Sequence, residues 1–548
     1  MIPLSSREIL KSQLRLLQGS RQRAAVNWPR PGTVGSCFGL CFGLFVGLID
    51  LGLLLPIHAV EPDPGITASE SADPAILVKE LARLEAQITD QAKPVTLDEA
   101  ISTGIRANPQ LLQAFSAIQQ YEWQLIAAQR QWYPTIQLSN GTPFAGIQWT
   151  SFTQNYSSTS PTAPPAYSNN TRQSAFQPGL SISWNAIDPT RQPNINSASE
   201  SLRQQKLLFD VSTRNLILNI QQSYFAIQSS RQLIDSFRRI YEINEQQLAI
   251  IEAQRSIGMT TVLDVEATRS QLFAQLNQLV GYTRAFIEQS ASLAEAMALP
   301  EGVLATPSEP AEIRGDWNLP LQETVKQARR QREEILASLA AAEAARWSAI
   351  AAIRSYLPAF QLVGTGTLIA NRGDQSYSYS GPSSETATSI RNQTASVGLG
   401  FTWSIFDGGI QAANAQSANA QARLQAAQAA STELQAMQEV RSSYGQLLTA
   451  RVAFSSGQQA YRSAELAQKA SRERFAVGVG DITSVVQTIQ QLSQAAEQVS
   501  EATLSYNSAL AQLYRYSATW PPLSQAEVQQ QLQRLRLSPA AAAPSAKP

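Results

Sequence analysis

The sequence has almost none of the side chains on which most metalloenzymes and covalent catalysts depend. Its 548 residues include two cysteines, Cys37 and Cys41, and one histidine, His58. All three lie near the N-terminus, so if that segment is removed on export, no thiol and no imidazole remain. This excludes disulfides, thiolate or imidazole metal ligands, and catalysis by cysteine or histidine. We therefore expect no cofactor and no enzyme of these classes.

Charge is also scarce. Charged residues make up 15% of the chain, and 42 basic residues balance 42 acidic ones, whereas a globular domain typically carries about 25% charge. This balance gives no indication of the basic face that nucleic-acid binding requires. The sequence also contains no Gly-x-x-x-x-Gly-Lys-Ser/Thr stretch that would hold nucleotide phosphates. A hydrolase using serine with lysine or glutamate is chemically feasible, but no motif places such residues together.

Long apolar runs are confined to the N-terminus. Basic residues from Arg7 to Arg30 precede an apolar run over residues 37–57, and the small Ala59 follows. This order predicts a signal peptide over residues 1–59. An uncleaved anchor is the alternative, because the basic region is long and Asp50 interrupts the run. Cleavage would leave 36 basic and 40 acidic residues, a net charge of −4. We expect no later membrane helix, so a later membrane crossing would use strands.

The chain repeats itself at a spacing of about 220 residues. Residues 97–100 align with 321–324, 132–134 with 356–358, 184–188 with 403–407, and 256–259 with 476–479. This predicts an N-terminal extension with a short amphipathic helix over residues 60–95, repeats over 96–299 and 321–520, a linker over 300–320, and a partly disordered tail over 521–548. Each repeat should open with one helix, over 97–131 or 321–355, that ends before Pro134 or Pro358.

Two strands are expected in each repeat, over residues 134–149 and 178–187, and over 358–370 and 396–406. The second strand of each pair alternates apolar residues with small or polar ones. In a membrane barrel the apolar residues would face lipid, and they are Leu180, Ile182, Trp184, Leu399, Phe401 and Trp403. An ordinary half-buried sheet gives the same pattern. The Ser/Thr/Pro/Asn-rich residues 150–175 and 371–394 are expected to form long loops.

Very long helices should follow these strands. Asp188 and Asp407 are predicted caps, because a carboxylate accepts the free amides of a first helical turn. The helices are expected over residues 189–256 and 409–476, each on the order of 100 Å long. They end at Gly258, and at Gly478 and Gly480, and shorter helices follow over 261–297 and 482–516. The sequence thus predicts two antiparallel helical hairpins, and a fold that is mainly α with a membrane β-barrel portion.

Four strands cannot close a membrane barrel by themselves. Known membrane barrels begin at eight strands, and open strand edges are not tolerated in lipid. The chain should therefore oligomerise. Two copies would supply eight strands and three would supply twelve. The wider barrel leaves room for a water-filled lumen, but the sequence does not choose between the two numbers.

This ordered set of features resembles the TolC-like outer membrane efflux protein family. The resemblance covers residues 95–520 and rests on the duplicated plan, the Trp-x-x-Phe-Asp-Gly stretch at 403–408, and the tip at 474–478 with the Gln-rich helix after it. It implies a homotrimer with a 12-stranded β-barrel in the outer membrane and an α-barrel in the periplasm. It also implies an export channel of a tripartite pump or type I secretion system. The partners would be a periplasmic adaptor, an inner-membrane transporter of RND, ABC or MFS type, and outer-membrane lipid.

The resemblance also implies a gate and an adaptor-docking surface at the helical tips. Asp264 matches an aspartate that links neighbouring hairpins, but its partner positions hold Phe475 and Gly480, which cannot form that bond. Asp481 could supply an acidic ring, although we favour a role in capping the next helix. The positions of the family's pore aspartates hold uncharged residues, Ser484 and Gln487.

Two other protein classes share long helices. A periplasmic adaptor also has helical hairpins, but it needs a strand-rich module of its own that the sequence does not indicate. A structural coiled-coil envelope protein without a pore would not need strands at two matching positions.

Overall fold

A computed structural model describes residues 74–154, 167–379 and 384–520, together with 530 and 533. The predicted signal peptide, residues 60–73 of the predicted extension, and all of the predicted tail over 521–548 except residues 530 and 533 lie outside the described residues. Contacts divide the chain after Thr67, so every described residue belongs to the second of two compact units.

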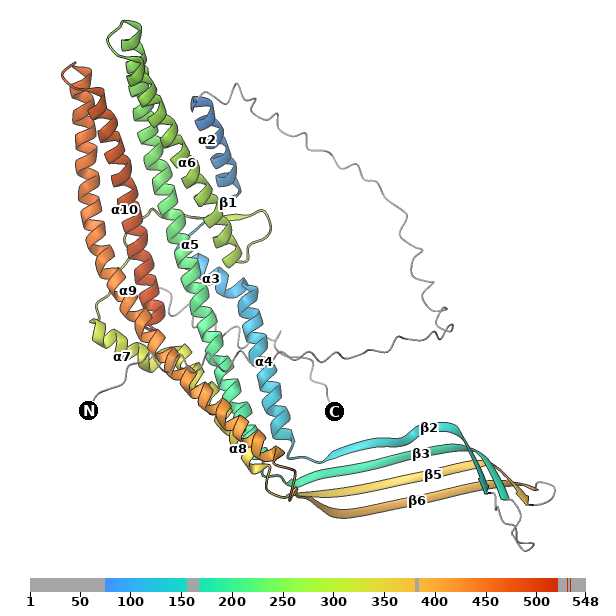
Figure 1. Ribbon diagram of the computed structural model, residues 1–548. Helices are drawn as coiled ribbons and strands as arrows, with labels where there is room; N and C mark the ends of the chain where they lie inside the picture. Colours follow the sequence, from blue (N-terminus) through green and yellow to red (C-terminus); the bar gives the residue numbers. More distant parts are fainter. Residues whose placement is uncertain (1–73, 155–166, 380–383, 521–529, 531–532, 534–548) are drawn as a thin grey trace, which may run out of the picture. The chain divides into compact units, whose positions relative to one another are not determined.

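One order of elements occurs twice along the chain (Figure 1). Two helices, two strands, a very long helix and a shorter helix form each half. The first half comprises α3 Leu97–Ala107, α4 Pro109–Arg130, β2 Thr135–Gln154, β3 Tyr167–Ile187, α5 Arg191–Ser256 and α6 Val262–Ala296. The second comprises α7 Leu321–Gln331, α8 Glu333–Arg354, β5 Ala359–Tyr379, β6 Ser384–Thr402, α9 Ile410–Ala476 and α10 Ile482–Tyr516.

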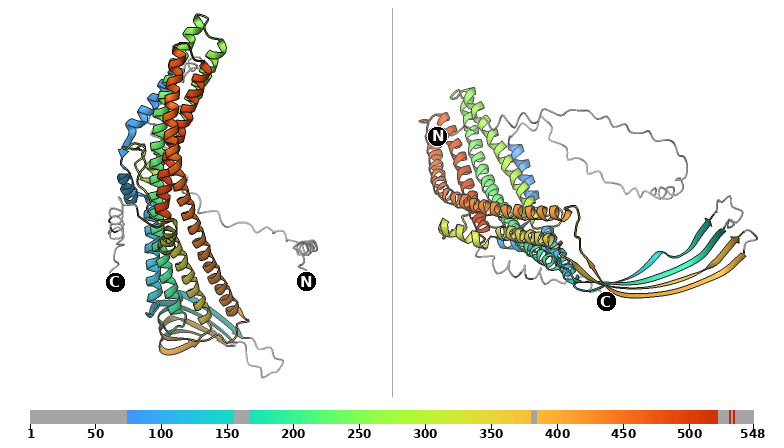
Figure 2. Two further views of the ribbon diagram at one scale, coloured as in Figure 1. Left: turned by 90° about the vertical axis from the view of Figure 1, so that its left-hand side faces the viewer. Right: turned by 60° about the horizontal axis from the view of Figure 1, so that its bottom comes forward.

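The long helices have the predicted extents. The 66 residues of α5 and the 67 residues of α9 correspond to about 100 Å each. Pro193 falls in the first turn of α5, where its missing N–H removes no helical bond. α5 packs against α4, α6, α8 and α10, and α9 packs against α8 and α10 (Figures 1 and 2).

The helix that we expected at the start of each repeat is broken in both. The first break is at Asn108, whose extended backbone ends α3 and begins α4. Its side chain accepts from the Gln110 amide at 2.8 Å and donates to the Ala296 carbonyl at 2.9 Å, and Pro109 cannot continue the helical bonding. The second break, at Arg332, has no proline. There the buried guanidinium bonds to Glu334, to Glu439 and to the Ala436 carbonyl, so tertiary contacts fix the break.

The four long strands form one antiparallel sheet in the order β2-β3-β5-β6. Within the described part of the chain, β2 and β6 each pair on one side only, so both outer strands have an open edge. The strands contact one another, and no helix makes more than marginal contact with them. The reading as an ordinary half-buried sheet is therefore wrong for one protomer.

The strands are longer than predicted. Much of 150–175 and 371–394, where we expected loops, belongs to paired strands. The Ser, Thr, Asn and Tyr residues of these stretches alternate across the two faces, and their backbones pair with the neighbouring strands. The loop prediction was wrong because it relied on polarity alone. β6 ends at Thr402, earlier than the expected residue 406, and Trp403 lies just beyond the strand.

Helices and linker bury three main apolar cores. The largest joins α3, α4, α5 and α6 around Tyr224 and Phe237, another fills both tips around Ile251 and Ile489, and a third joins α7, α9 and α10. The predicted amphipathic helix is present as α2 Pro74–Gln91, and its apolar side chains pack on the first two cores. Prediction missed a short parallel pair, β1 Ala92–Val95 with β4 Leu304–Pro307. Each of these strands has only four residues, one of which is a proline.

One stretch among the described helices, Leu321–Arg354, is long enough to cross a membrane and contains an 18-residue window with a mean hydropathy of 1.2, which is apolar enough to do so. This differs from our expectation of no such segment after the N-terminus. The stretch comprises α7 and α8, broken at Arg332, and it packs against α5 and α9. Its apolar character reflects alanine-rich packing between helices.

Candidate functional site

The sheet carries a continuous apolar surface on one face. Residues paired across antiparallel strands share a face, so the register defines its rows. Ile136 lies beside Ile182, and Leu138 beside Leu180; Trp184 lies beside Leu362, which lies beside Leu399. The opposite face at these levels carries mainly small or polar residues, as in the row Gln137, Ser181, Thr365 and Ser396, with Val363 as an exception in the next row.

Five of the six residues predicted to face lipid lie on β3 or β6 and share this apolar face. Leu180, Leu399 and Phe401 are 46%, 81% and 69% exposed, so the protomer itself does not cover them. Ile182 and Trp184 occupy the same face by register. Trp403 lies past the end of β6 and is therefore not a strand residue.

Two tryptophans tie the sheet to the helices in the same way. The indole nitrogen of Trp184 donates to the Trp132 carbonyl, and that of Trp403 to the Tyr356 carbonyl, both at 3.0 Å. Each acceptor stands two residues before a proline that immediately precedes a strand. Trp403 thus has a defined role at the junction of sheet and helix.

The two predicted capping aspartates behave differently. The Asp407 carboxylate accepts from the amides of Gly409 at 2.9 Å and Gln411 at 2.7 Å, so it caps the first turn of α9. The Asp188 carboxylate accepts from the amide and hydroxyl of Thr190, which closes a turn before α5. The first turn of α5 itself receives no side-chain cap from Thr190.

Both hairpin tips are closed by the same backbone motif. The residue at the left-handed position is Gly258 after α5 and Gly478 after α9, with φ of 78° and 77°. The amides of Met259 and Val479 reach back to the carbonyls of Gln254 and Arg474. This pattern is the Schellman motif, in which glycine adopts the left-handed conformation without strain.

Gly480 is required for a different reason. Its φ is not positive, but a Cβ there would lie 2.9 Å from the Phe475 backbone nitrogen. The Phe475 ring belongs to the tip core and is 9% exposed. Phe475 and Gly480 therefore pack within one hairpin.

The side chain of Asp264 forms its hydrogen bonds within its own chain. Its carboxylate accepts from the Thr261 amide at 2.9 Å and hydroxyl at 2.7 Å, and Thr261 accepts from the Asp264 amide. This reciprocal capping box begins α6. The hydrogen bonds from the Thr261 hydroxyl and amide lower the pKa of Asp264 below its usual value.

The remaining predicted gate residues form an exposed polar face of α10. Asp481, Ser484 and Gln487 are exposed and recur every three residues, whereas Ile482, Val485 and Ile489 are buried on the other side. Asp481 occupies the N-cap position but makes no side-chain capping bond. The capping role that we favoured for its side chain is therefore wrong.

Sequence reasoning missed the apolar character of the tips. The six residues that carry it are between 55% and 76% exposed. They are Ile257, Met259, Val262 and Leu263 on the first tip, and Val477 and Val479 on the second. Such a cluster at the ends of helices is a signal for a binding surface.

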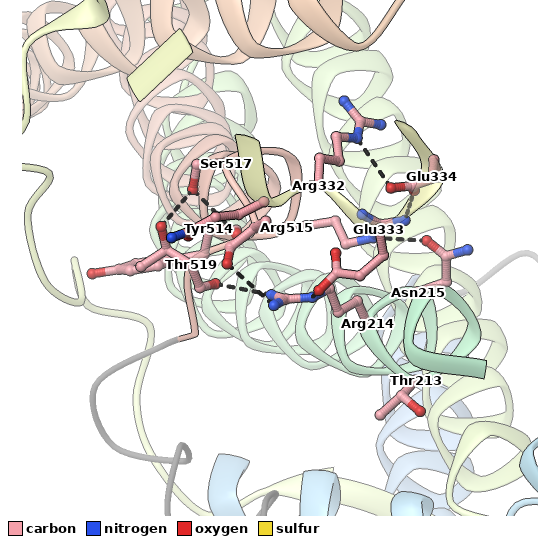
Figure 3. Close-up of polar contacts among 12 residues, drawn as sticks. Thr213, Arg214, Asn215, Arg332, Glu333, Glu334, Tyr514, Arg515, Ser517 and Thr519 are labelled. Carbon is pink, nitrogen blue, oxygen red and sulfur yellow. Dashed lines mark hydrogen bonds and ion pairs between the residues drawn. The ribbon is translucent and has the colours of Figure 1, made fainter. Parts of the chain in front are cut away.

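A buried ion-pair network, also missed, surrounds the break at Arg332 (Figure 3). Glu334 pairs with Arg332 and with Arg515, and Glu333 pairs with Arg214 at 2.8 Å. The three arginine side chains are only 4–5% exposed. Burial alone would raise the pKa of Glu334, but the hydrogen bond and charge of Arg515 and the charge of Arg332 bring it below its usual value.

No cluster of three or more His, Cys, Asp or Glu suited to a metal ion occurs among the residues that the structure describes. The exposed features are thus the apolar sheet face, the open sheet edges and the helical tips.

Comparison with known proteins agrees with this geometry. The family model for outer membrane efflux proteins matches residues 100–299 and again 324–519. The chain belongs to the outer membrane efflux protein family. It is 22% identical over 345 residues to the outer membrane protein TolC of Escherichia coli (strain K12), covering 62% of this chain and 68% of TolC. The protein is thus a TolC-like member of a family of outer-membrane channels rather than of enzymes, and it resides in the outer membrane.

Solved channels share the fold. The Campylobacter jejuni CmeC outer membrane channel matches with a TM-score of 0.65 at 16% identity, over 80% of this chain and 89% of that one. The outer-membrane channel OprN matches with a TM-score of 0.63 at 15% identity, over 77% and 90%. The Neisseria gonorrhoeae MtrE channel in its open state matches with a TM-score of 0.56 at 17% identity, over 77% and 89%.

Proposed function

We propose that three copies of the mature chain form one outer-membrane duct that conducts substrates from an inner-membrane transporter to the exterior. Each copy would supply four strands to a 12-stranded barrel and its long helices to a periplasmic tunnel. The observation that carries the proposal is the four-stranded sheet with two open edges and an uncovered apolar face. In lipid those edges must pair, and joining β2 of one copy to β6 of the next satisfies them.

The two halves of the chain support the same assembly. Both contain the same order of elements, and the family model matches each half separately. We propose that they arose by internal duplication, so that the trimer is a ring of six similar units. A periplasmic adaptor or a structural coiled-coil protein would have no use for two uncovered strand pairs.

The experiment is to purify the full-length protein from outer membranes in detergent and insert it into planar bilayers. We expect a trimer that dissociates on heating in SDS and discrete conductance steps. A monomer, or a trimer without conductance, would contradict the duct. In cells, deletion should increase sensitivity to toxic compounds or block secretion of an exported protein.

We further propose that the tips hold the gate and dock the adaptor. The exposed face of α10 that carries Asp481, Ser484 and Gln487 lies opposite the buried side of its hairpin, as expected for a face that lines the axis. These residues differ from the charged pore residues that the resemblance implies. Gly258, Gly478, Gly480, Phe475 and Asp264 would shape the tips without forming links between hairpins.

Gate and docking surface can be tested separately. Gln487→Cys channels should lose conductance when a bulky thiol reagent is added, whereas the wild type, which has no cysteine after the predicted signal peptide, should not respond. Leu263→Asp should weaken cross-linking to the adaptor without changing conductance. A reagent-insensitive Gln487→Cys channel would place the constriction elsewhere.

A further inference from the structure

On one face of the long strands, apolar residues give way to polar and charged ones at a boundary that membership of the family does not predict. On β5, the apolar face runs through Phe360, Leu362, Leu368 and Ala370, and then changes to Arg372, Asp374 and Ser376 in the same alternation. On β3 the same face changes after Phe176 to Ser174, Arg172 and Asn170. The apolar surface therefore stops part-way along the sheet, although the strands continue.

Three arginines lie at this boundary on three adjacent strands. Arg391 of β6 pairs with Ala370, Arg372 of β5 pairs with Ser174, and Arg172 of β3 pairs with Asp374. Since paired residues share a face, all three lie on the apolar face. All three are exposed, and no ion pair is formed by any of them within the described chain.

The position of this arginine row matches the level of lipid headgroups. From the level of Trp184 to that of Arg172, β3 extends about 40 Å. At a strand tilt of about 40° this is about 30 Å along the membrane normal, slightly more than the ~25 Å apolar band of a barrel. Trp149 pairs with Arg172 at the same level, and tryptophan marks both interfaces of membrane barrels.

The balance of charge at this level favours an anion. Asp374 lies beside Arg172, and Glu385 of β6 is one row further from the apolar band, beside Ser376. Arg372 and Arg391 are the two closest to the band. Arg372 is paired with serines on both neighbouring strands and Arg391 with an alanine, so neither has an acidic residue directly opposite. Guanidinium groups bind phosphate oxygens through paired hydrogen bonds.

We propose that Arg172, Arg372 and Arg391 bind the phosphate groups of an anionic lipid headgroup in the outer leaflet. The inference rests on the proposed barrel with its helices in the periplasm, because that places this end of the sheet outward. The bound lipid would fix the depth of the barrel and cover its outer rim.

The test uses the purified full-length protein in detergent, with diphosphorylated lipid A as the probe and native mass spectrometry as the measurement. The variant combines Arg172→Gln, Arg372→Gln and Arg391→Gln. We expect its apparent Kd for lipid A to be about 100-fold weaker than that of the wild type. The control combines Arg330→Gln, Arg441→Gln and Arg462→Gln, three exposed helical arginines, and should bind as the wild type does.

Further measurements separate the explanations. Dephosphorylated lipid A should bind wild type and variant equally, because the contact is to phosphate. If millimolar inorganic phosphate displaced lipid A completely, the row would be a site for free anions, and the proposal would be wrong. Equal binding of lipid A by wild type and variant would also overturn it.

Assembly is measured in the same samples. If the glutamine variant does not form a heat-sensitive trimer, the triple arginine-to-lysine variant replaces it, and its loss of affinity should be smaller because charge is kept while paired hydrogen bonding is lost. Unchanged affinity in that variant would contradict the paired contact. A wild type that conducts but binds phosphorylated and dephosphorylated lipid A equally well would refute only this inference. A wild type that forms no heat-sensitive, conducting trimer would refute the proposed function.

Discussion

At the scale of single residues, two glycines near one tip are needed for different physical reasons. Gly478 supplies a left-handed conformation in open space, whereas Gly480 is closely approached by backbone. Left-handed geometry costs an alanine about 1–2 kcal/mol. A Cβ at 2.9 Å from a backbone nitrogen cannot be relieved by a side-chain rotation.

We therefore predict that Gly480→Ala is the more damaging change. It should lower the free energy needed to open the tip by more than Gly478→Ala does. The reason is that the backbone of the turn between α9 and α10 must shift to make room for the new Cβ. Gly445→Ala is the control, since this glycine lies inside α9 with nothing within 4 Å and alanine there should be neutral or stabilising. Hydrogen exchange of tip amides measures all three, and equal protection in the Gly478 and Gly480 variants would contradict the steric argument.

The buried network gives a second prediction at this scale. Glu334→Gln leaves the buried guanidinium of Arg515 without its carboxylate and that of Arg332 with Glu439 alone, and should cost about 3 kcal/mol. Because the pKa of Glu334 is lowered on folding, its contribution is present above the unfolded pKa of about 4.3 and is lost as pH falls through the lower native value. The stability difference between wild type and Glu334→Gln should therefore shrink below about pH 4.

Denaturant unfolding followed by circular dichroism, at neutral pH and at pH 3–4, checks this expectation. Glu343→Gln is the matched control, because Glu343 pairs with Arg346 on the surface, with side chains 44% and 67% exposed. Such pairs contribute less than about 1 kcal/mol. A similar loss of unfolding free energy in both variants would show that the buried ion pairs stabilise the fold no more than the surface pair does.

At the scale of elements, the sequence predicted those helix ends that nearby residues determine. Glycines at 258 and 478, followed by Thr261 and Asp481, marked the ends of the long helices to within a few residues. The break at Asn108 was missed although Pro109 was visible, because proline in a first turn and proline in a kink look alike in sequence. The break at Arg332 depends on Glu439, a hundred residues away, and no local pattern could reveal it.

Packing between elements supplies the next prediction. A Cβ on Gly104 of α3 would lie 2.5 Å from Ile220 Cδ1 of α5 and 3.2 Å from the Ala296 carbonyl oxygen. We expect Gly104→Ala to destabilise the first core by about 1–3 kcal/mol. Ile220→Val removes Cδ1, so the double variant should be less destabilised than the two single changes predict together. Strict additivity in urea unfolding would argue against this contact.

At the scale of the whole molecule, alternation in two short segments predicted the sheet and its apolar face, but not the full length of the strands. Leu180, Leu399 and Phe401 were identified because apolar and small residues alternate around them. The outer parts of the strands were missed because they are polar on both faces, as water-exposed strands can be. That the chain must oligomerise could be inferred from closure, since four strands in one chain leave two edges open, whereas the proposed number of three copies rests on the family resemblance.

Two adjacent residues on opposite faces provide the decisive variant pair for this architecture. Leu399 lies on the apolar face and is 81% exposed, whereas Gly398 lies on the other face with open space around it. A lysine at Leu399 would enter lipid and should cost about 2–4 kcal/mol per chain. Because the trimer contains three copies, Leu399→Lys should nearly abolish assembly into heat-sensitive trimers in the outer membrane. Gly398→Lys should assemble and alter conductance, because its ammonium would enter the aqueous lumen. If Leu399→Lys assembled and Gly398→Lys did not, the barrel would have to be built with the opposite face outward. If both variants assembled equally well, neither residue would face lipid.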